Sequence, residues 1–235
     1  MYTSGTFPLP QDLENDRIKL VPYIPSFHSE LFAELSKKYP ETYKYIPWGH
    51  SEVQAAFDSE TFRREHKWLL FAILDKTRPS DNSTASDGAL AGTIAFIDCA
   101  PRNLSVELGA VLIFPPFQRT HVASNAVGLM LQYALNKPSE GGLGLRRVVW
   151  LANYLNEGSI RLAKRFQFQQ EGLLRWHMVL PPNLDGYLAG NGKVLREEDP
   201  KPGCAGRDTA LFTLTWDDWE GGAKENAAGV MSRTM

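Results

Sequence analysis

The chain has 235 residues, of which 43% are hydrophobic, and a formal net charge of −2 at pH 7. That length and apolar content suffice for one domain with a sizeable core, although two small domains would also fit. The near-neutral charge argues against nucleic acid as a partner, and no apolar run is long enough to cross a membrane. The N-terminal residues show no secretory signal, so the cytoplasm is the expected location, with the nucleus left open.

Metal and disulfide chemistry have little support in the sequence. The five histidines show no metal-ligand spacing such as H-E-x-x-H, so no metal is expected. Cys99 and Cys204 are the two cysteines, and they lie far apart along the chain. They could pair, but two cysteines do not make a disulfide framework.

Apolar residues that alternate with polar ones, or short apolar runs bounded by turn residues, predict seven strands. The strands cover residues 17–22, 68–74, 90–99, 106–114, 147–153, 173–180 and 208–216. Apolar residues at helical spacing predict helices over 27–38, from Ser51 to about Glu65, over 122–135, and between Asn156 and Gln167. No internal repeat or shift in composition divides this series of elements.

Three segments of different character interrupt or follow these elements. Residues 75–89 are polar and predict a long, mobile hairpin loop, and residues 181–206 form an insertion rich in glycine, proline and charge. From Gly221 onward the chain is expected to lack fixed structure. Residues 1–220 are therefore predicted to form a single domain and residues 221–235 a disordered C-terminal tail.

The stretch 106–135 predicts a strand, a tight turn and a helix in succession. Alternation in the strand predicts one face that holds Val106, Leu108, Ala110, Leu112 and Phe114. The turn, residues 118–121, leads into the helix. The first N–H groups of a helix have no partner within it, and together with the helix dipole they attract an anion. Arg119 adds a positive charge, so this turn is a candidate anion site.

Several short motifs occur in a specific order along nearly the whole chain. The sequence from Gln118 to Ala123 matches the pattern Gln/Arg-x-x-Gly-x-Gly/Ala except at His121. The other motifs are Arg17-Ile18-Lys19-Leu20, Tyr45-Ile46-Pro47-Trp48, Asn156-x-x-Ser159, Phe168-x-x-Glu171-Gly172 with Arg175, and Asp208 through Trp219. By their order and spacing the chain resembles the GNAT superfamily of N-acetyltransferases, in particular the RimJ/RimL-type branch of ribosomal-protein acetyltransferases. His121 and Gln167 stand where that family has glycine.

The resemblance implies a fold and a co-substrate. The fold is of the α/β (α+β) class: a mixed, mostly antiparallel sheet of about seven strands with helices on both faces. A splay between the strands at 106–114 and 147–153 would receive acetyl-CoA, and no metal is implied. The residues implied in binding acetyl-CoA are Leu112, Ile113, Phe114, Gln118, Arg119, Thr120, His121, Val122, Ala123, Asn156 and Ser159.

Two catalytic residues follow from the resemblance and from the chemistry of acyl transfer to an amine. The amine must lose a proton and the departing thiolate must gain one. Glu107 is the candidate base, either directly or through water, and Ser159 the candidate proton donor. In the alternative interpretation, Glu107 is paired with a basic side chain, Asn156 caps a helix and Ser159 is its N3 partner.

Acceptor recognition is the part that the sequence specifies least. Tyr45, Trp48, Trp176 and His177 could wall a substrate pocket, although most aromatic residues belong simply to the core. The insertion 181–206 follows the strand that carries Trp176 and His177, and loops on a rigid scaffold commonly determine specificity. We therefore expect this insertion to govern the choice of amine.

The predicted function is acyl-CoA-dependent N-acyl transfer by direct attack, with acetyl-CoA as the donor and a primary amine as the acceptor. The amine could belong to a small molecule or to a peptide N-terminus. The alternative is a non-catalytic acyl-CoA-binding or interaction protein on the same fold. A homodimer is compatible with the sequence.

Overall fold

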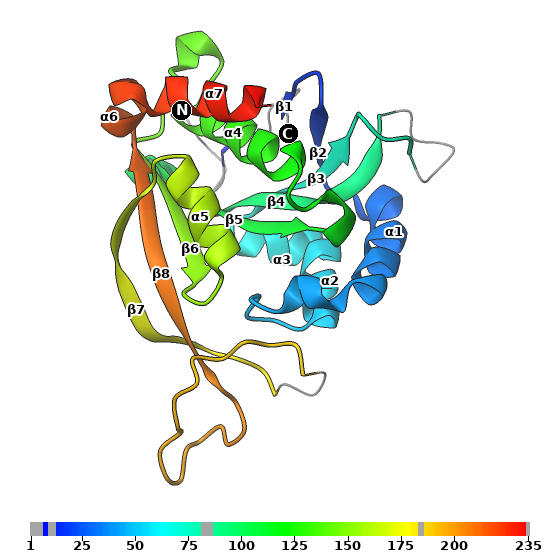
Figure 1. Cartoon of the computed structure of the whole chain (residues 1–235), viewed down its shortest axis with the longest axis vertical. Coiled ribbons are helices and arrows are strands. Elements are labelled where there is room, and N and C mark those ends of the chain that lie inside the picture. The colour runs from blue at the N-terminus through cyan, green and yellow to red at the C-terminus, as the bar shows by residue number, and fades with distance from the viewer. Residues whose placement is uncertain (1–6, 9–12, 81–86, 183–185, 234–235) are drawn as a thin grey trace.

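The computed structural model describes residues 7–8, 13–80, 87–182 and 186–233. At its centre is one sheet with strand order β1-β2-β3-β4-β5-β6-β8-β7 (Figure 1). The strands are β1 (Leu13–Glu14), β2 (Ile18–Pro22), β3 (Leu69–Asp75), β4 (Ala89–Ala100), β5 (Ser105–Ile113), β6 (Arg147–Asn153), β7 (Gln169–Val179) and β8 (Gly206–Thr215). Neighbours are antiparallel except β5 and β6. The mixed, mostly antiparallel sheet is confirmed. It has eight strands in the described residues because β1, in a region where no strand is predicted, pairs with β2.

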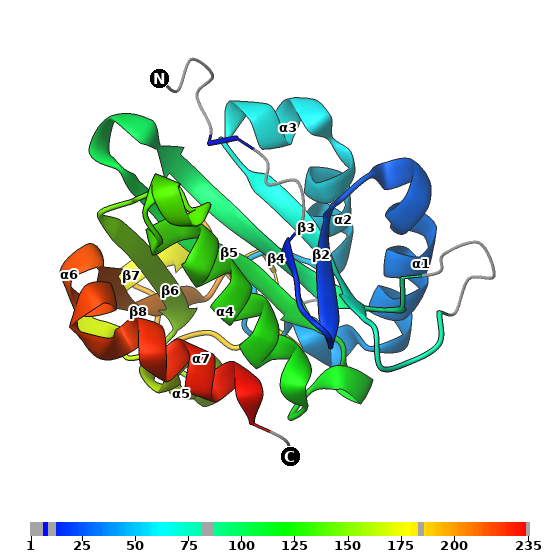
Figure 2. The ribbon, with the colours of Figure 1, turned by 90° about the horizontal axis from the view of Figure 1, so that it is seen from above.

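Helices cover both faces of the sheet, as predicted. They are α1 (Pro25–Lys38), α2 (His50–Asp58), α3 (Glu60–Glu65), α4 (His121–Leu135), α5 (Glu157–Arg165), α6 (Trp216–Asp218) and α7 (Lys224–Ser232). Figure 2 shows α4 and α7 on one side of the sheet and α1, α2 and α3 on the other. Ring contacts agree with this arrangement: Phe96 of β4 stacks on Tyr133 of α4, with centroids 6.3 Å apart, whereas Phe114, just after β5, meets Phe32 of α1 at 5.5 Å.

The two parallel strands separate along their length. Ser105–Glu107 of β5 pair with Arg147–Val149 of β6, and both strands then continue to Ile113 and Asn153 without recorded pairing to each other in the described chain. The predicted splay is therefore present. Strands that diverge inside a sheet leave backbone groups that need other partners, so the opening suits an extended polar ligand.

β5 contains a bulge that its alternating sequence does not reveal. Gly109 pairs with Ala95 and Leu112 pairs with Thr93, so β5 uses one more residue than β4 over this stretch. Ala110 lies in the bulge with a φ of +48°, and its carbonyl accepts a hydrogen bond from Thr93 Oγ1 at 3.1 Å. An extra residue of this kind shifts the alternation of side chains by one position.

The shift changes which side chains share a face. Before the bulge, Val106 and Leu108 are buried toward α4, and Glu107 points to the opposite face. After the bulge, Leu112 and Phe114 lie on the face of Glu107, where Phe114 meets α1. The prediction of one shared face for the alternate residues of 106–114 is therefore wrong beyond the bulge.

Two predicted helix boundaries also need correction. The helix predicted from Ser51 to about Glu65 is two helices, because Ser59 has an extended conformation and caps α3 by accepting a hydrogen bond from the Phe62 N–H at 3.1 Å. α1 begins at Pro25. A hairpin joins β3 to β4 as expected, but residues 81–86 at its centre lie outside the described residues, so the predicted mobility of that loop is not tested.

Gln167 occupies a backbone position that favours glycine. It follows the end of α5 with a φ of +63°, and its N–H donates to the Lys164 carbonyl at 3.0 Å. The family's glycine is therefore needed there for conformation, and a glutamine in this region costs about 1–2 kcal/mol.

The tail predicted to be disordered forms α7. Ala223, Ala227 and Val230 are buried at helical spacing. α7 packs against α4 where Gly128 leaves room for Met231, since a Cβ on Gly128 would lie 2.3 Å from the Met231 Sδ. That prediction, which rests on the position of the segment at the chain terminus, is wrong because packing against α4 fixes the segment as a helix. Residues 234–235 lie outside the described residues.

Candidate active site

The turn between β5 and α4 is a helix N-terminus with unusual backbone geometry. Gln118 is extended, Arg119 has a φ of +58°, and Thr120 caps α4. The Thr120 Oγ1 donates to the Phe117 carbonyl at 2.6 Å and accepts from the Val122 N–H at 3.3 Å. The remaining first-turn N–H groups of this 15-residue helix have no intrahelical partner, so the turn can hold an anion.

Two predicted cofactor residues have partners within the protein. Gln118 Nε2 donates to the Ile113 carbonyl at 2.9 Å, and His121 Nε2 lies 3.2 Å from Oδ1 of the buried Asp75. His121 is the first helical residue of α4, and the positive φ of the turn falls on Arg119 instead. Histidine in place of the family's glycine therefore introduces no strain here and ties the turn to β3.

The other residues predicted to bind acetyl-CoA near β5 and α4 line the turn and the splay mainly with their backbone. Leu112, Ile113 and Phe114 lie where β5 has separated from β6, and their side chains are buried. Val122 is also buried and Ala123 is partly buried in the first turn of α4. A ligand in the splay would therefore meet main-chain groups here.

Asn156 and Ser159 have structural partners. Asn156 caps α5, and its Oδ1 accepts from the Ser159 N–H at 3.1 Å. The Ser159 Oγ accepts from the indole N–H of the buried Trp150 at 2.9 Å. This is the capping arrangement of the alternative interpretation. It leaves the hydroxyl proton of Ser159 free to be donated, so both roles can coexist.

Glu107 sits on the sheet face opposite α4 in a tightly packed place. Its Oε1 would lie 2.9 Å from a Cβ on Gly109, so the glycine in this motif makes room for the carboxylate. Burial, together with the negative charge of Asp98, raises the pKa of Glu107 to about 7, against the opposing charge of Arg207. A carboxylate with that pKa can both accept and release a proton near neutral pH.

Arg207 at the start of β8 is a functional candidate that sequence reasoning missed. Its residue is 5% exposed, and its position along β8 places it on the same sheet face as Glu107. Burial lowers the pKa of Arg207, and the nearby charge of Glu107 opposes that effect. The only sequence signal was its place beside the predicted last strand, and an arginine there is usually a surface residue.

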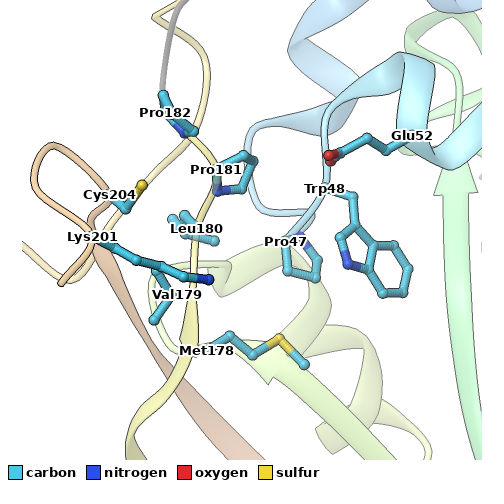
Figure 3. A pocket seen from close by; sticks show the side chains of 10 residues that line it. All are labelled: Pro47, Trp48, Glu52, Met178, Val179, Leu180, Pro181, Pro182, Lys201 and Cys204. Atoms are coloured by element: carbon cyan, nitrogen blue, oxygen red, sulfur yellow. The ribbon is translucent and has the colours of Figure 1, made fainter.

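A cavity of about 580 Å³ opens between the segment before α2 and the end of β7 (Figure 3). Its walls are mostly apolar, and they come from segments far apart in the sequence. The lining residues are Pro47, Trp48, Glu52, Met178, Val179, Leu180, Pro181, Pro182, Lys201 and Cys204. Figure 3 shows the Lys201 ammonium directed toward Pro47 and the Glu52 carboxylate toward Pro181, so one charge of each sign borders the cavity.

Of the four predicted acceptor residues, only Trp48 lines this cavity. Tyr45 is partly buried under the Lys44 ammonium, which lies 5.3 Å from its ring centroid. Trp176 packs against Gly206 on the insertion side. His177 Nδ1 lies 3.1 Å from Thr209 Oγ1, and burial followed by the charge of Arg207 lowers the pKa of this histidine.

The described part of the insertion, residues 186–206, is fixed to the sheet by a buried carboxylate. Asp208 Oδ1 accepts from the Trp176 N–H at 2.8 Å and from Asn191 Nδ2 at 2.9 Å, and its Oδ2 pairs with Lys193 Nζ at 2.5 Å. These contacts, that of Lys193 first, lower the pKa of Asp208 to about 2. The insertion is therefore held at its base as a defined element.

The far end of the insertion bridges two other segments. The Ala189 N–H donates to the Lys44 carbonyl at 2.8 Å, and the Ala189 carbonyl accepts from Asn153 Nδ2 at 2.9 Å. Figure 1 shows this arm passing beneath α2 from the ends of β7 and β8. The insertion thus joins the end of β6 to the segment that supplies Trp48.

The described residues do not meet the requirements of a metal site, a membrane-spanning helix or a disulfide. They contain no group of three or more His, Cys, Asp or Glu side chains that could hold a metal ion. Within the same residues, every helix falls short of the length and apolar character that spanning a bilayer requires. Cys99 and Cys204 are both free thiols, one buried and one at the cavity.

The strand order, the splay, the bulge and the helix N-terminus together define an acetyltransferase of one known class. Residues 17–169 match the family model described as an acetyltransferase (GNAT) domain. The chain therefore belongs to the GNAT family, and the predicted fold and enzyme class are confirmed. The non-catalytic alternative gains no support from this family.

Solved structures extend the likeness beyond that domain. A GCN5-related N-acetyltransferase from Brucella melitensis is 24% identical, with a TM-score of 0.69 over 96% of this chain and 87% of the other. An acetyltransferase from Salmonella typhimurium that modifies the N-terminal serine of 50S ribosomal subunit protein L7/L12 is 16% identical, with a TM-score of 0.62 over 87% and 99% of the two chains.

The microcin C7 self-immunity acetyltransferase MccE, solved in complex with acetyl-CoA and AMP, is 18% identical. Its TM-score is 0.58, over 86% of this chain and 93% of the other. No curated protein matches the sequence significantly. At these identities the structures establish a shared fold, and the acceptor has to be argued from the site itself.

Proposed function

We propose that this enzyme transfers the acetyl group of acetyl-CoA directly to a primary amine, with Glu107 as the base. The observation that carries the proposal is the pKa of Glu107, raised to about 7 by burial and by Asp98, on the sheet face beside the splay. An alkylamine is almost wholly protonated at neutral pH, so a base of this kind is needed before attack.

The cofactor side of the molecule fits a nucleotide-containing thioester. The α4 N-terminus with Arg119 would bind its phosphates, and main-chain groups of Leu112 and Ile113 would bind the extended arm in the splay. Bound acetyl-CoA would supply an activated acetyl group on sulfur. Because phosphate contacts are equal in the ground and transition states, this part of the site sets affinity more than turnover.

The protein's own residues then move the protons. The ammonium first gives one proton to Glu107, which releases it to solvent. The neutral amine nitrogen then forms a bond to the acetyl carbon, Glu107 takes the second proton from it, and the carbon–sulfur bond breaks. Ser159 donates its hydroxyl proton to the departing sulfur and regains a proton from solvent. Glu107 releases the proton that it took from the amine to solvent. The products are the N-acetylated amine and free CoA, and no enzyme nucleophile takes part.

Two measurements test this function. Acetyl-CoA should raise the melting temperature progressively, because it binds the native state alone. CoA release from acetyl-CoA should accelerate with at least one amine in a panel of small amines, amino acids and N-terminal peptides. A melting temperature unchanged at millimolar acetyl-CoA would refute cofactor binding, and binding without turnover of any amine would refute the proposed transfer.

A further inference from the structure

Arg207 is a buried cation with an unsatisfied hydrogen-bond donor among the described residues. Its Nε has no hydrogen-bond partner among the described residues, and its Nη1 contacts only the thioether of Met178, at 3.8 Å. A guanidinium offers five N–H donors and stays charged in proteins. Leaving the Nε donor buried without an oxygen partner is costly, so an oxygen ligand at this position would be stabilising.

The surroundings of Arg207 place that ligand in the acceptor site. Met178, which is the cross-strand partner of Arg207, lines the apolar cavity, and Figure 3 shows its side chain directed toward Pro47 and Trp48. On the other side, the charge of Arg207 acts on Glu107. The guanidinium therefore contacts a residue of the cavity wall and is close enough to the candidate base for the two charges to interact.

Glu107 does not satisfy Arg207. No ion pair within 4 Å joins the two side chains in the described part of the chain, although each acts on the charge of the other. A ligand that carries a positive or neutral nitrogen beside a negative oxygen group would complement both. A guanidinium binds a carboxylate in a two-pronged geometry, and such pairs are among the strongest hydrogen-bonded contacts.

We propose that Arg207 binds the carboxylate of the acceptor, and that the acceptor is a free α-amino acid with a large apolar side chain. This inference rests on the proposed function and names its substrate class. The amine lies at Glu107, the carboxylate at Arg207, and the side chain in the cavity lined by Trp48, Met178 and Leu180. The α-amine and the carboxylate of an amino acid are separated by one carbon, which suits binding to Glu107 and Arg207 on the same sheet face.

Three acceptors that share one side chain test the proposal. Phenylalanine carries the carboxylate, phenethylamine lacks it, and phenylalaninamide replaces it by the carbonyl that a peptide N-terminus would present. At pH 9, where Glu107 is ionised, kcat/KM for phenylalanine should exceed that for the other two by on the order of 10²-fold. Equal values, or a preference for the amide, would overturn the proposal, and the second result would point to peptide N-termini.

Variants of Arg207 test whether this residue causes the preference for an acceptor with a carboxylate. Arg207→Gln should reduce the advantage of phenylalanine to a few-fold, and Arg207→Lys should keep part of it by retaining the charge without the fork. Arg175→Gln, which removes an exposed arginine from β7, is the matched control and should leave the preference intact. A preference that survives in Arg207→Gln would assign carboxylate recognition to another residue and refute the inference.

A binding measurement separates this inference from the proposed function. N-acetylphenylalanine should raise the melting temperature of the wild type more than N-acetylphenethylamine does, and Arg207→Lys should reduce that difference. If no amine is turned over, the proposed transfer fails, but product binding still decides the role of Arg207. Should Arg207→Gln fail to fold, Arg207→Lys and the wild-type comparison give the same decision, and equal shifts by the two products would contradict the proposal.

Discussion

The two halves of the site differ in how the chain builds them. The cofactor side is one continuous stretch, from β5 through the turn to α4, and its polar groups are mainly backbone groups. The acceptor side combines the segment before α2, the ends of β7 and β8, and an insertion held by Asp208. Binding of a common co-substrate thus depends on local geometry, whereas acceptor choice depends on side chains that only the fold brings together.

Glu107 lies where the two halves meet, and its replacement should have the largest effect. Glu107→Gln keeps the shape but cannot accept a proton, so we expect kcat to fall by on the order of 10²–10⁴-fold with little change in acetyl-CoA binding. The pKa of about 7 predicts that wild-type kcat declines as the pH falls through 7, and the variant should lose this dependence. Steady-state kinetics from pH 6 to 9 measure both.

Asp98→Asn is the matched control for that experiment. Asp98 is exposed and raises the pKa of Glu107, so its removal should move the acidic limb of the pH profile to lower pH without a comparable loss of kcat. If Glu107→Gln turned over amines as the wild type does at every pH, the base would lie elsewhere. If it failed to fold, the role of Glu107 would be structural.

Asp208 tests whether the acceptor side depends on its buried support. Asp208→Asn removes the charge that holds Lys193, so we expect a lower melting temperature, by roughly 5 °C at pH 7, and an altered order of amine preference. Acetyl-CoA binding should persist because the cofactor side does not use Asp208. An unchanged amine profile would make the insertion a spacer.

The same residue predicts a pH dependence of stability. The pKa of Asp208 is lowered to about 2 in the folded protein from an ordinary value of 3.8. Its contribution to stability is therefore complete above about pH 4 and is lost as the pH falls toward 2. The difference in melting temperature between the wild type and Asp208→Asn should shrink over that range, and a constant difference would contradict the assignment.

Removal of α7 tests whether the stretch from β5 to α4, which forms the cofactor side, is stable without a helix packed against it. Deletion of residues 224–235 would expose the surface of α4 around Gly128, so we expect the melting temperature to fall, by on the order of 10 °C. Gly128→Leu should do so as well, because its side chain would collide with Met231. An unaltered melting temperature in both variants would show that α7 contributes nothing to the fold.

Arg119 gives the smallest expected effect. Arg119→Ala should weaken acetyl-CoA binding by about tenfold while kcat at saturating acetyl-CoA stays within a few-fold of the wild type. Arg102→Ala, at an exposed arginine distant in sequence from the turn, is the control and should change neither value. A variant of Arg119 that lost only kcat would place this residue in the chemical step.

The sequence by itself determined what depends on local order along the chain. The turn at 118–123, the strand before it and the motif order were sufficient to predict the family, because backbone geometry follows from neighbouring residues. The family resemblance in turn implied the splay, and the role of Glu107 stays a prediction. Alternation failed at the bulge around Ala110, and position at the chain terminus failed as a guide to α7, because a bulge and close helix packing depend on partners far away in sequence.

Only the tertiary structure decided the acceptor side. Arg207 became a candidate because it is buried and its Nε has no partner in the described part of the chain. The cavity sorted the four predicted aromatic residues, because Trp48 is the one of the four that lines it. Burial and pKa are properties of the three-dimensional environment: desolvation depends on every element that packs around a group. A residue type and its spacing therefore cannot say which charge is paired and which is left for a substrate.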